Sequence, residues 1–526
     1  MRWRALPVVA IALLAAARLA HAADRPRDTA EVGAFLDGLV AGLMTERHVP
    51  GAVVLVVKDG AMLVARGYGV ADLSTGRPVD PETTLFRVAS VSKLFTATAA
   101  MQLVEQGKLA LDADVNRWLD GFTLAERFGK PVTLANLLTH TAGFDDRLLG
   151  MTAPLTAPPV ALGTYLAGHM PPRVLPPGDV LSYSNHGLAL VGYLVQRASG
   201  EPFAEYVRRH ILEPLGMMHS GFGLPDPLPP GLAVPYLYKS GAYIPMGYDR
   251  LRVGPAGDLY TSAADMSRFM IAHLEGGRLG GTRILGEATA RAMHRRQFSH
   301  HPRLDGWCYG FEETSRNGVR TIGHGGDWRG FGTILVLVPD ARLGLFVSTT
   351  RSYDIRFMKP LVDRFFDRYF PRAAPIGPPA PPADFAARAA RFTGTYLPVR
   401  HVRGDFLKLG LFEGESRVTA DGTGALVLHH PRDVLDPVRL VEVGPLLFQS
   451  SDNGRFVAFR TDRRGRVSHM FLGPYAMTRA AFWEWPRLHG VVALVCLVVF
   501  AATAAGWAVG AVTRRLAGGP PGAVPW

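Results

Sequence analysis

Apolar positions recur with two different periods along the first third of the chain. In residues 30–46 they follow the 3.6-residue period of a helix, which predicts an amphipathic helix there. The next two runs, GAVVLVVKDG and AMLVARGYGV, are rich in β-branched residues and meet at Asp59-Gly60, a pair that favours a hairpin turn. A second helix is expected over residues 90–107, and residues 110–310 have the pattern of a helix-rich region with many loops.

Three more strand-like runs follow, VRTIGHGG, FGTILVLVPD and RLGLFVSTT, and an amphipathic helix over residues 352–370 completes the pattern. A helix, two strands, a helical insertion, three strands and a final helix predict an α/β fold in which an antiparallel sheet is flanked by helices. We expect this α/β body to occupy residues 23–372.

The composition changes at AAPIGPPAPPAD, residues 373–384, where so much proline can continue neither a helix nor a central strand. This segment predicts a stiff linker. Beyond it, residues 385–480 hold short alternating runs such as GALVLHH and RFVAFRTD, separated by glycine-containing turns. That pattern predicts a small all-β domain, a compact barrel or a sandwich.

The N-terminus has the pattern of a targeting segment. Arg2 and Arg4 precede the apolar run ALPVVAIALLAAA, and AHA offers a small-x-small cleavage site. The run covers about half of a membrane span, which favours a secretory signal peptide over residues 1–22 rather than a permanent anchor.

The C-terminal apolar segment is long enough to cross a bilayer. Residues 490–512 carry no charge, and a core helix rarely stays apolar on every face for that length. We therefore expect a transmembrane helix over residues 488–513, with Arg514 and Arg515 on the cytoplasmic side. The protein is expected to be an extracytoplasmic (periplasmic) body held at the cell membrane by its tail.

Length and composition exclude several classes of protein. A chain of 526 residues with 48% hydrophobic and 19% charged residues is globular and holds more than one unit. The net charge of +12 comes without a basic helix or an aromatic-interleaved stripe, so no nucleic-acid partner is expected. The two cysteines, Cys308 and Cys496, are not expected to form a disulfide, because the second lies in the apolar C-terminal segment.

Lysine is scarce, which draws attention to one serine–lysine pair. Only 7 of the 57 basic residues are lysine, and Lys93 alone among them follows a serine, Ser90, by three positions. At that spacing both side chains share a helix face. A serine hydroxyl needs a neighbouring base to become a nucleophile, and lysine can lose its proton where arginine cannot. Its apolar surroundings, LFRVASVSKLFTATAAM, argue against a solvated helix face.

Two further groups of residues carry the same kind of chemistry. Tyr183 and Asn185, in LSYSNHG, form the only Tyr-x-Asn of the chain and are suited to proton relay and to binding a carbonyl, although a packed tyrosine beside an Asx turn is the alternative reading.

The other group is the segment TIGHGGDWRGF, in which His324, Gly325 and Gly326 end a strand and leave its edge open for a substrate. The backbone N–H groups of Ser90 and Asp327 could then hold an oxyanion between them.

The order Ser-x-x-Lys, Tyr-x-Asn and a glycine-rich strand end resembles serine β-lactamases and penicillin-binding proteins. The chain is most similar to the class C β-lactamase-like serine hydrolases, which include DD-peptidases, D-aminopeptidases and carboxylesterases. The resemblance covers about residues 30–370 and includes LLTHTAGF, LEPLGMMHS and PAGDLYTSAADMSRF. It implies a helical domain beside the sheet, with a cleft between them, and a lipocalin-like C-terminal domain.

The resemblance also implies a role for each matching residue. Ser90 corresponds to the nucleophile, Lys93 and Tyr183 to the proton-transfer pair, and Asn185 to a contact of substrate and lysine. His324 stands where class C β-lactamases carry a lysine that helps bind the carboxylate of the drug. A largely neutral histidine does this less well near pH 7, which favours cleavage of an ester or a peptide-like amide over efficient β-lactam hydrolysis.

Three readings of the function follow. The leading one is a membrane-anchored serine hydrolase acting through an acyl-enzyme on a small or peptide-like acyl substrate. A true β-lactamase or DD-carboxypeptidase is the alternative enzyme, and a catalytically silent binding or sensory module is the alternative outside enzymes. We expect no cofactor and no metal, because the pairs His300-His301 and His429-His430 lack a third ligand at metal spacing. The oligomeric state is left open.

Overall fold

The structure, a computed structural model of the chain, describes residues 26–372, 379–431 and 435–517. The predicted signal peptide and the first half of the predicted linker therefore lie outside the described residues. The chain divides into two compact units. The N-terminal unit runs to Gly377 and includes the short segments Val402–Gly404 and Phe471–Ala476, and the C-terminal unit holds the rest.

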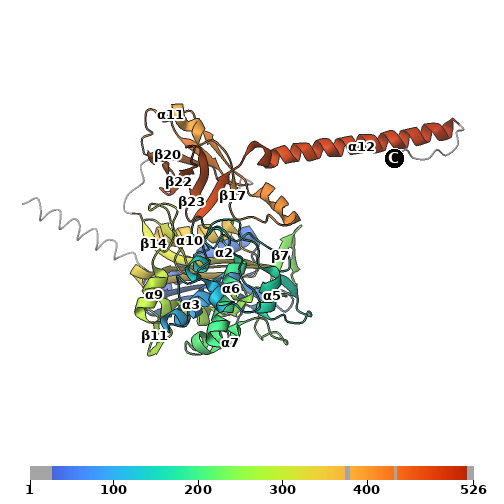
Figure 1. The fold of residues 1–526 in the computed structure, drawn as a ribbon. Coiled ribbons are helices and arrows are strands. Elements are labelled where there is room, and N and C mark those ends of the chain that lie inside the picture. Colours follow the sequence, from blue (N-terminus) through green and yellow to red (C-terminus); the bar gives the residue numbers. More distant parts are fainter. Residues whose placement is uncertain (1–25, 373–378, 432–434, 518–526) are drawn as a thin grey trace, which may run out of the picture. The chain divides into compact units, whose positions relative to one another are not determined.

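A seven-stranded antiparallel sheet forms the centre of the N-terminal unit (Figure 1). Its order is β13-β14-β15-β16-β1-β2-β3. Strand β1, near the start of the sequence, therefore pairs with β16, near the end of the unit, within the sheet. The strands are β1 (Gly51–Lys58), β2 (Ala61–Asp72), β3 (Arg77–Pro78), β13 (Glu312–Arg316), β14 (Val319–Trp328), β15 (Phe331–Val338) and β16 (Leu343–Thr349).

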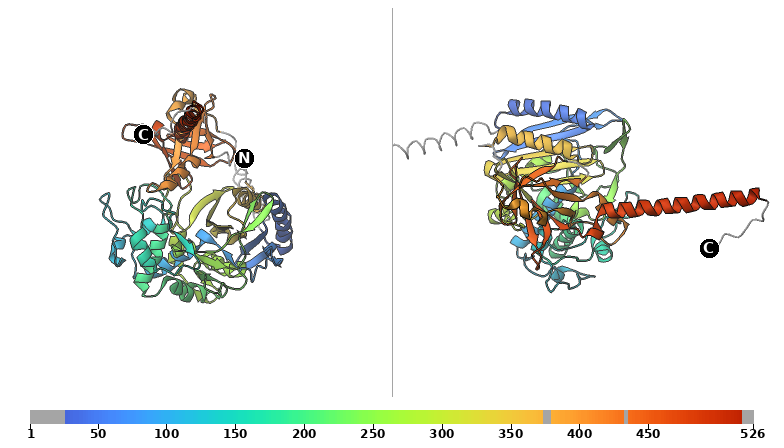
Figure 2. Two further views of the ribbon diagram at one scale, coloured as in Figure 1. Left: turned by 90° about the vertical axis from the view of Figure 1, so that its right-hand side faces the viewer. Right: turned by 90° about the horizontal axis from the view of Figure 1, so that it is seen from above.

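Every residue of strand β1 is buried. Because successive side chains of a strand point to opposite sides of the sheet, β1 must be covered on both faces. Val54 and Val56 pack with the helices α2 (Thr29–Arg47) and α10 (Ile355–Tyr369), which lie side by side on one face (Figure 2). Val53 belongs to the larger core on the other face. The sheet is therefore enclosed between two helices and a helical region.

The helical region holds the segments that will matter for the site. Helix α3 is buried along almost its whole length, including polar residues such as Lys93 and Gln102, so its exposed face is confined to its C-terminal end. The helices are α3 (Ser92–Glu105), α4 (Leu134–Leu138), α5 (Leu162–His169), α6 (Asn185–Ser199), α7 (Phe203–Val207), α8 (Ala263–Leu274) and α9 (Glu287–His294). The short strands between them are β4 (Phe86–Arg87), β5 (Thr152–Pro154), β6 (Gly221–Phe222), β7 (Tyr236–Lys239), β8 (Ala242–Pro245), β9 (Asp249–Leu251), β10 (Leu259–Thr261), β11 (Arg278–Leu279) and β12 (Thr282–Arg283).

The predicted fold class is confirmed, with differences at the margins. The first hairpin turns at Asp59 and Gly60, both with left-handed backbone, as the dipeptide predicted. The edge strands β3 and β13 were not expected, because they are short and carry charged residues without an alternating apolar pattern. The helix expected from position 90 begins instead at Ser92, and Ser90 lies in the preceding 3₁₀ turn η1 (Ala89–Val91).

The C-terminal unit is built around a closed eight-stranded barrel, so the prediction of a small all-β domain is confirmed. Closure pairs the last strand with the first and leaves no free sheet edge. The strands are β17 (Gly394–Pro398), β18 (Ser416–Ala420), β19 (Leu426–His429), β20 (Val438–Gly444), β21 (Leu447–Ser450), β22 (Phe456–Thr461), β23 (Val467–Leu472) and β24 (Tyr475–Arg479), preceded by the short helix α11 (Phe385–Arg388).

One long helix, α12 (Pro486–Leu516), follows the barrel. Its segment Leu488–Leu516 has a mean hydropathy of 2.4 in its most apolar window, and none of that window is buried. Among the described residues it is the one helix long and apolar enough to cross a membrane. This is weak evidence for an anchor, because length and composition are the only criteria it meets.

Three buried histidines make the N-terminal unit sensitive to acid. His273 of α8 lies between the Thr98 hydroxyl and the ring of His294, each at 3.1 Å. His186 of α6 contacts the hydroxyl of Tyr165 at 3.0 Å. Burial lowers the pKa of His186 and of His294 to about 4 and that of His273 well below its ordinary value.

We expect the free energy of unfolding to fall as the pH drops from about 6.5 to about 4. Over this range the unfolded chain takes up protons at the three histidines while the folded chain does not, which costs up to about 1.4 kcal/mol per pH unit for each. Thermal unfolding of the full chain in detergent, followed by circular dichroism between pH 7.5 and 4.5, measures the slope. His294→Gln should make the slope shallower, and equal slopes in the two proteins would contradict the assignment.

Candidate active site

Ser90 lies on a strained turn at the entrance to α3. The residue before it, Ala89, has a φ of 47°, in the left-handed region that costs a non-glycine residue roughly 1 kcal/mol or more. Ser92 holds the turn in place, because its hydroxyl donates to the Ala89 carbonyl at 2.6 Å and accepts from the Leu259 N–H at 3.0 Å. The strain is thus sustained by hydrogen bonds to a distant segment of the chain.

Lys93 is completely buried, and its amino group contacts three oxygen atoms. Nζ lies 2.9 Å from the Ser90 Oγ, 2.8 Å from the Asn185 Oδ1 and 2.6 Å from the Ala256 carbonyl oxygen. Ala256 lies in the 3₁₀ turn η4 (Gly254–Ala256), so these oxygens come from three separate parts of the chain. A buried amino group without such partners would be strongly destabilising.

Tyr183 and Asn185 are brought to the same place by the start of α6. Ser184 is the N-cap of this helix, with its side chain accepting from the Gly187 N–H, and Asn185 is the first helical residue. The ring of Tyr183 lies 4.9 Å from the Lys93 Nζ. The structure therefore unites Ser90, Lys93, Tyr183 and Asn185, as their spacing and the resemblance predicted.

His140, in the loop after α4, holds the tyrosine loop from two sides. Its carbonyl accepts from the Ser182 N–H at 2.8 Å, and its Nδ1 accepts from the Ser184 N–H at 3.1 Å. Its ring lies 4.1 Å from the ring of Tyr183. His140 lies in the segment LLTHTAGF. Its contact with Tyr183 depends on the fold and has no signal in the local sequence.

Trp307 is the second residue that the sequence did not single out. It is fully buried, and its indole lies edge-on to the rings of His140, Tyr183 and His324, with centroids 5.0, 6.0 and 5.9 Å away. Edge-to-face contacts of this kind stabilise a fixed ring geometry. Trp307 therefore restrains the orientation of both predicted site rings.

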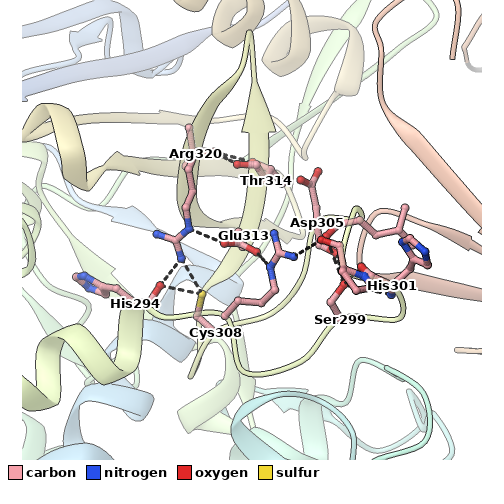
Figure 3. Close-up of polar contacts among 12 residues, drawn as sticks. His294, Ser299, His301, Asp305, Cys308, Glu313, Thr314 and Arg320 are labelled. Atoms are coloured by element: carbon pink, nitrogen blue, oxygen red, sulfur yellow. Dashed lines mark hydrogen bonds and ion pairs between the residues drawn. The ribbon is translucent and has the colours of Figure 1, made fainter. Parts of the chain in front are cut away.

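A buried carboxylate supports the segment that carries Trp307 (Figure 3). Glu313 of β13 is 3% exposed and pairs with Arg296 and Arg320. Arg320 also donates to the carbonyl of His294, and the thiol of Cys308 contacts the same carbonyl at 3.2 Å. Residues 294–308 are thereby joined to β13 and β14, the strand on which His324 lies.

His324 lies on the face of β14 that is directed toward the nucleophile turn, the same face as Gly326. Burial, assisted by the nearby charge of Lys93, lowers the pKa of His324 to about 3, so the ring is neutral near pH 7. Its Nδ1 donates to the carbonyl of Gly325 at 2.6 Å, since a carbonyl oxygen only accepts.

The glycines of β14 differ in what surrounds them. A Cβ on Gly326 would lie 2.3 Å from the Val88 carbonyl oxygen, so the strand passes the nucleophile turn at a distance that only glycine allows. A Cβ on Gly325 would meet nothing closer than the Tyr353 ring at 3.8 Å. The Asp327 carboxylate accepts from the Tyr353 N–H at 3.0 Å.

An ion cluster that the sequence did not reveal joins the segments around Ser90. Arg87 of β4 is 2% exposed and donates to Asp249 at 2.9 Å and to Asp258 at 2.7 Å. Asp249 also accepts from the Trp328 indole at the end of β14. Burial raises the pKa of Asp258 to about 6, against the opposing effect of Arg87. A charged residue inside the apolar run LFRVAS was the available signal for a buried partner.

Comparison with known proteins gives matches over most of this chain. A profile described as Beta-lactamase matches residues 36–364, well over half of the sequence. Penicillin-binding protein 4 of Amycolatopsis lactamdurans is 32% identical over 372 residues, which are 67% of this chain and 94% of that protein. Esterase EstB of Burkholderia gladioli is 38% identical over 222 residues, 40% of this chain, and the match spans only 56% of the esterase.

Solved structures resemble the fold as well. The crystal structure of SurE shares 26% sequence identity and a TM-score of 0.59, and the match covers 85% of this chain and 99% of SurE. A class C β-lactamase mutant shares 23% identity with a TM-score of 0.54 over 64% of this chain and 97% of its own. The second comparison bears on the fold alone.

We expect Gly326→Ala to lower the rate of ester hydrolysis by about a hundredfold or more. The added methyl group must push β14 away from the nucleophile turn, and a small displacement of reacting groups lowers the rate by that factor. Gly325→Ala, where the methyl group has space, should cause a much smaller loss. Initial rates on a chromogenic ester test the pair. Equal losses would show that the close approach of β14 is unimportant.

We expect His140→Phe to lower kcat by roughly ten- to a hundredfold. The aromatic ring is kept, but the buried Ser184 N–H loses its hydrogen-bond acceptor, which costs about 1–3 kcal/mol of free energy. His140→Asn should recover most of the rate, since its Oδ1 can accept that hydrogen bond and asparagine tolerates the left-handed backbone at this position, where φ is 55°. Rates and unfolding free energies are measured on both variants. Equal rates in the two would rule out the hydrogen bond as the reason.

Proposed function

Because this chain belongs to the β-lactamase family and is a serine hydrolase, we propose that it forms an acyl-enzyme at Ser90 and cleaves an ester or a peptide-like amide. The observation that carries the proposal is the placement of the Lys93 Nζ, 2.9 Å from the Ser90 Oγ and held by two further oxygens. A nucleophile within hydrogen-bond reach of a fixed base is the arrangement that covalent catalysis requires.

The contacts of Lys93 account for how it can take a proton from Ser90. A neutral amine carries two N–H bonds and one lone pair. The Asn185 Oδ1 and the Ala256 carbonyl can only accept, so they take both N–H bonds and leave the lone pair directed at the serine hydroxyl. Attack of the Ser90 Oγ on a substrate carbonyl then transfers its proton to Lys93.

The remaining steps use groups around this pair. The backbone N–H groups of Ser90 and Asp327 are proposed to stabilise the tetrahedral oxyanion. When that intermediate collapses, the pair of Lys93 and Tyr183 passes the proton to the departing alcohol or amine. A water molecule then attacks the acyl group, gives its proton to the same pair, and releases the acid as Ser90 regains its hydrogen.

The neutral ring of His324 favours substrates without a carboxylate at this position. A carboxylate there would lose its solvation without gaining an ion pair, which is unfavourable. The similarity to an esterase agrees with this choice. A β-lactamase or DD-carboxypeptidase is the second enzymatic candidate, favoured by the similarity to penicillin-binding proteins. A silent binding module would keep this arrangement without turnover.

We propose that the hydrolase unit is extracytoplasmic and held at the membrane by α12. The support is the exposed apolar segment Leu488–Leu516, the arginine pair Arg514 and Arg515 at its end, and the signal-like pattern of residues 1–22. Anchoring would confine the enzyme to substrates at or near the membrane surface.

We expect the full chain in detergent to hydrolyse neutral esters at least tenfold faster than otherwise matched esters bearing a carboxylate beside the scissile bond, since one unfavourable buried charge costs about 1.4 kcal/mol or more. D-amino-acid peptides and a labelled penicillin, tested in parallel, separate the alternatives. Faster turnover of the penicillin than of any ester would favour the β-lactamase reading.

Ser90→Ala is the control for every substrate and should lower kcat by about 10⁴-fold or more. A fluorophosphonate probe should label the wild type and Ser74→Ala, which changes an exposed serine in the turn after β2, but not Ser90→Ala. Absence of labelling in the folded wild type would instead support the silent module.

A further inference from the structure

The C-terminal unit exposes five large apolar side chains on two short 3₁₀ helices. Phe406 and Leu409 of η7 (Phe406–Glu413) are 64% and 57% exposed. On and beside η9 (Phe482–Glu484), Phe482, Trp483 and Trp485 are 61%, 71% and 36% exposed. We refer to these five side chains as the apolar rim.

Both short helices contact α12. Among the described residues of the C-terminal unit outside α12, Val443 is the one other large apolar side chain that is exposed. Barrel aromatics such as Phe392, Phe448 and Phe459 are buried, with their rings packed edge-on, whereas Tyr475 of β24 is 44% exposed. An apolar patch on an otherwise polar surface indicates a binding surface.

The rim is continuous with α12. Helix α12 begins at Pro486, one residue after Trp485, and η7 lies against it. The uncharged stretch Gly490–Val512 is about 35 Å long as a helix, close to the ~30 Å thickness of a hydrocarbon core. Trp485 then lies about 7 Å before the start of this stretch, at the depth of lipid headgroups.

We propose that the apolar rim is a second membrane contact, in which η7 and η9 lie in the interfacial layer of the bilayer that α12 crosses; this rests on the proposed anchoring by α12. The chemistry of the rim fits that layer, because tryptophan is enriched at membrane interfaces and because tryptophan, phenylalanine and leucine form the apolar face of helices that lie in the interface. Lys408, exposed on η7 between Phe406 and Leu409, can extend its amino group to a lipid phosphate while its stem stays among apolar atoms.

A second contact changes what the anchor does. A single helix leaves a domain free to tilt, whereas two neighbouring contacts restrict the angle between the barrel and the bilayer. A second copy of this chain could also cover an apolar surface, but the direct continuity of the rim with the uncharged stretch of α12 favours lipid.

The test places a fluorescent label at chosen depths in the full chain. Leu409→Cys is prepared with Cys496→Ala and labelled with the environment-sensitive dye NBD, then reconstituted in vesicles of phosphatidylcholine and phosphatidylglycerol. The second native thiol, Cys308, is buried with its pKa raised to about 12, so it does not compete for the label. Arg464→Cys, at an exposed position in the polar turn between β22 and β23, is the matched control, and unsubstituted Cys496 reports on α12 itself.

We expect the label at position 409 to emit at shorter wavelength in vesicles and to lose about half of its intensity with lipids carrying a nitroxide near the headgroup, because interfacial side chains lie at that depth. The label at 464 should show neither change, and adding Phe406→Glu should reduce the quenching at 409. If 496 is quenched by deep nitroxides while 409 behaves like 464, the docking is wrong and the anchor stands. If 496 is not quenched either, the anchor itself fails. A blue-shifted but unquenched label at 409 would identify a protein partner and overturn the proposal.

Discussion

The buried amino group of Lys93 is the interaction on which the arrangement of the N-terminal unit depends. An amino group without water must find acceptors within the protein, and its three oxygens come from the nucleophile turn, the start of α6 and the η4 turn. Each of these segments reaches the lysine from a different part of the sequence. The requirement to satisfy one buried group therefore holds the reacting serine, the asparagine and the η4 carbonyl in a common geometry.

A set of hydrogen bonds and close contacts behind this group makes the geometry rigid. His140 fixes the tyrosine loop, and Ser92 fixes the strained turn before the nucleophile. Gly326 lets β14 approach that turn, while Arg87 links the turn to the end of the same strand through Asp249. Strain and buried charge both cost stability, and here both lie beside the nucleophile, where a fixed geometry has a functional use.

Charge distinguishes this site from one built to bind an acidic substrate. The ring of His324 is neutral near pH 7, because burial and the nearby Lys93 oppose its protonation. The Glu313 cluster pairs one carboxylate with two guanidinium groups, and the Arg87 cluster pairs one guanidinium group with two carboxylates, so the central charge of each cluster has partners. The proposed esterase-like activity therefore assigns an uncharged acyl group, and not an anionic one, to this site.

Much of the fold could be predicted from local pattern, because the 3.6- and 2-residue periods specify which face each element buries. The hairpin at Asp59-Gly60, the helices α2 and α10, the all-β character of the C-terminal domain and the apolar C-terminal helix are all readable in this way, whereas closure into a barrel was not distinguished from a sandwich. Ser90, Lys93, Tyr183, Asn185 and His324 were also recognisable, since their chemistry and spacing are visible in the chain. Edge strands such as β13 were not, because charged residues at a sheet edge leave no periodic signal.

The residues that hold the site together could not be identified from local sequence patterns. His140, Trp307, Arg87 and the carbonyl of Ala256 act through partners 17 to 171 positions away or through the backbone, where side-chain identity gives no information. The sequence alone thus determined the elements and the reactive groups. Which distant atoms approach them depended on packing, because burial, backbone strain and hydrogen-bond geometry are properties of the folded chain and not of any local segment.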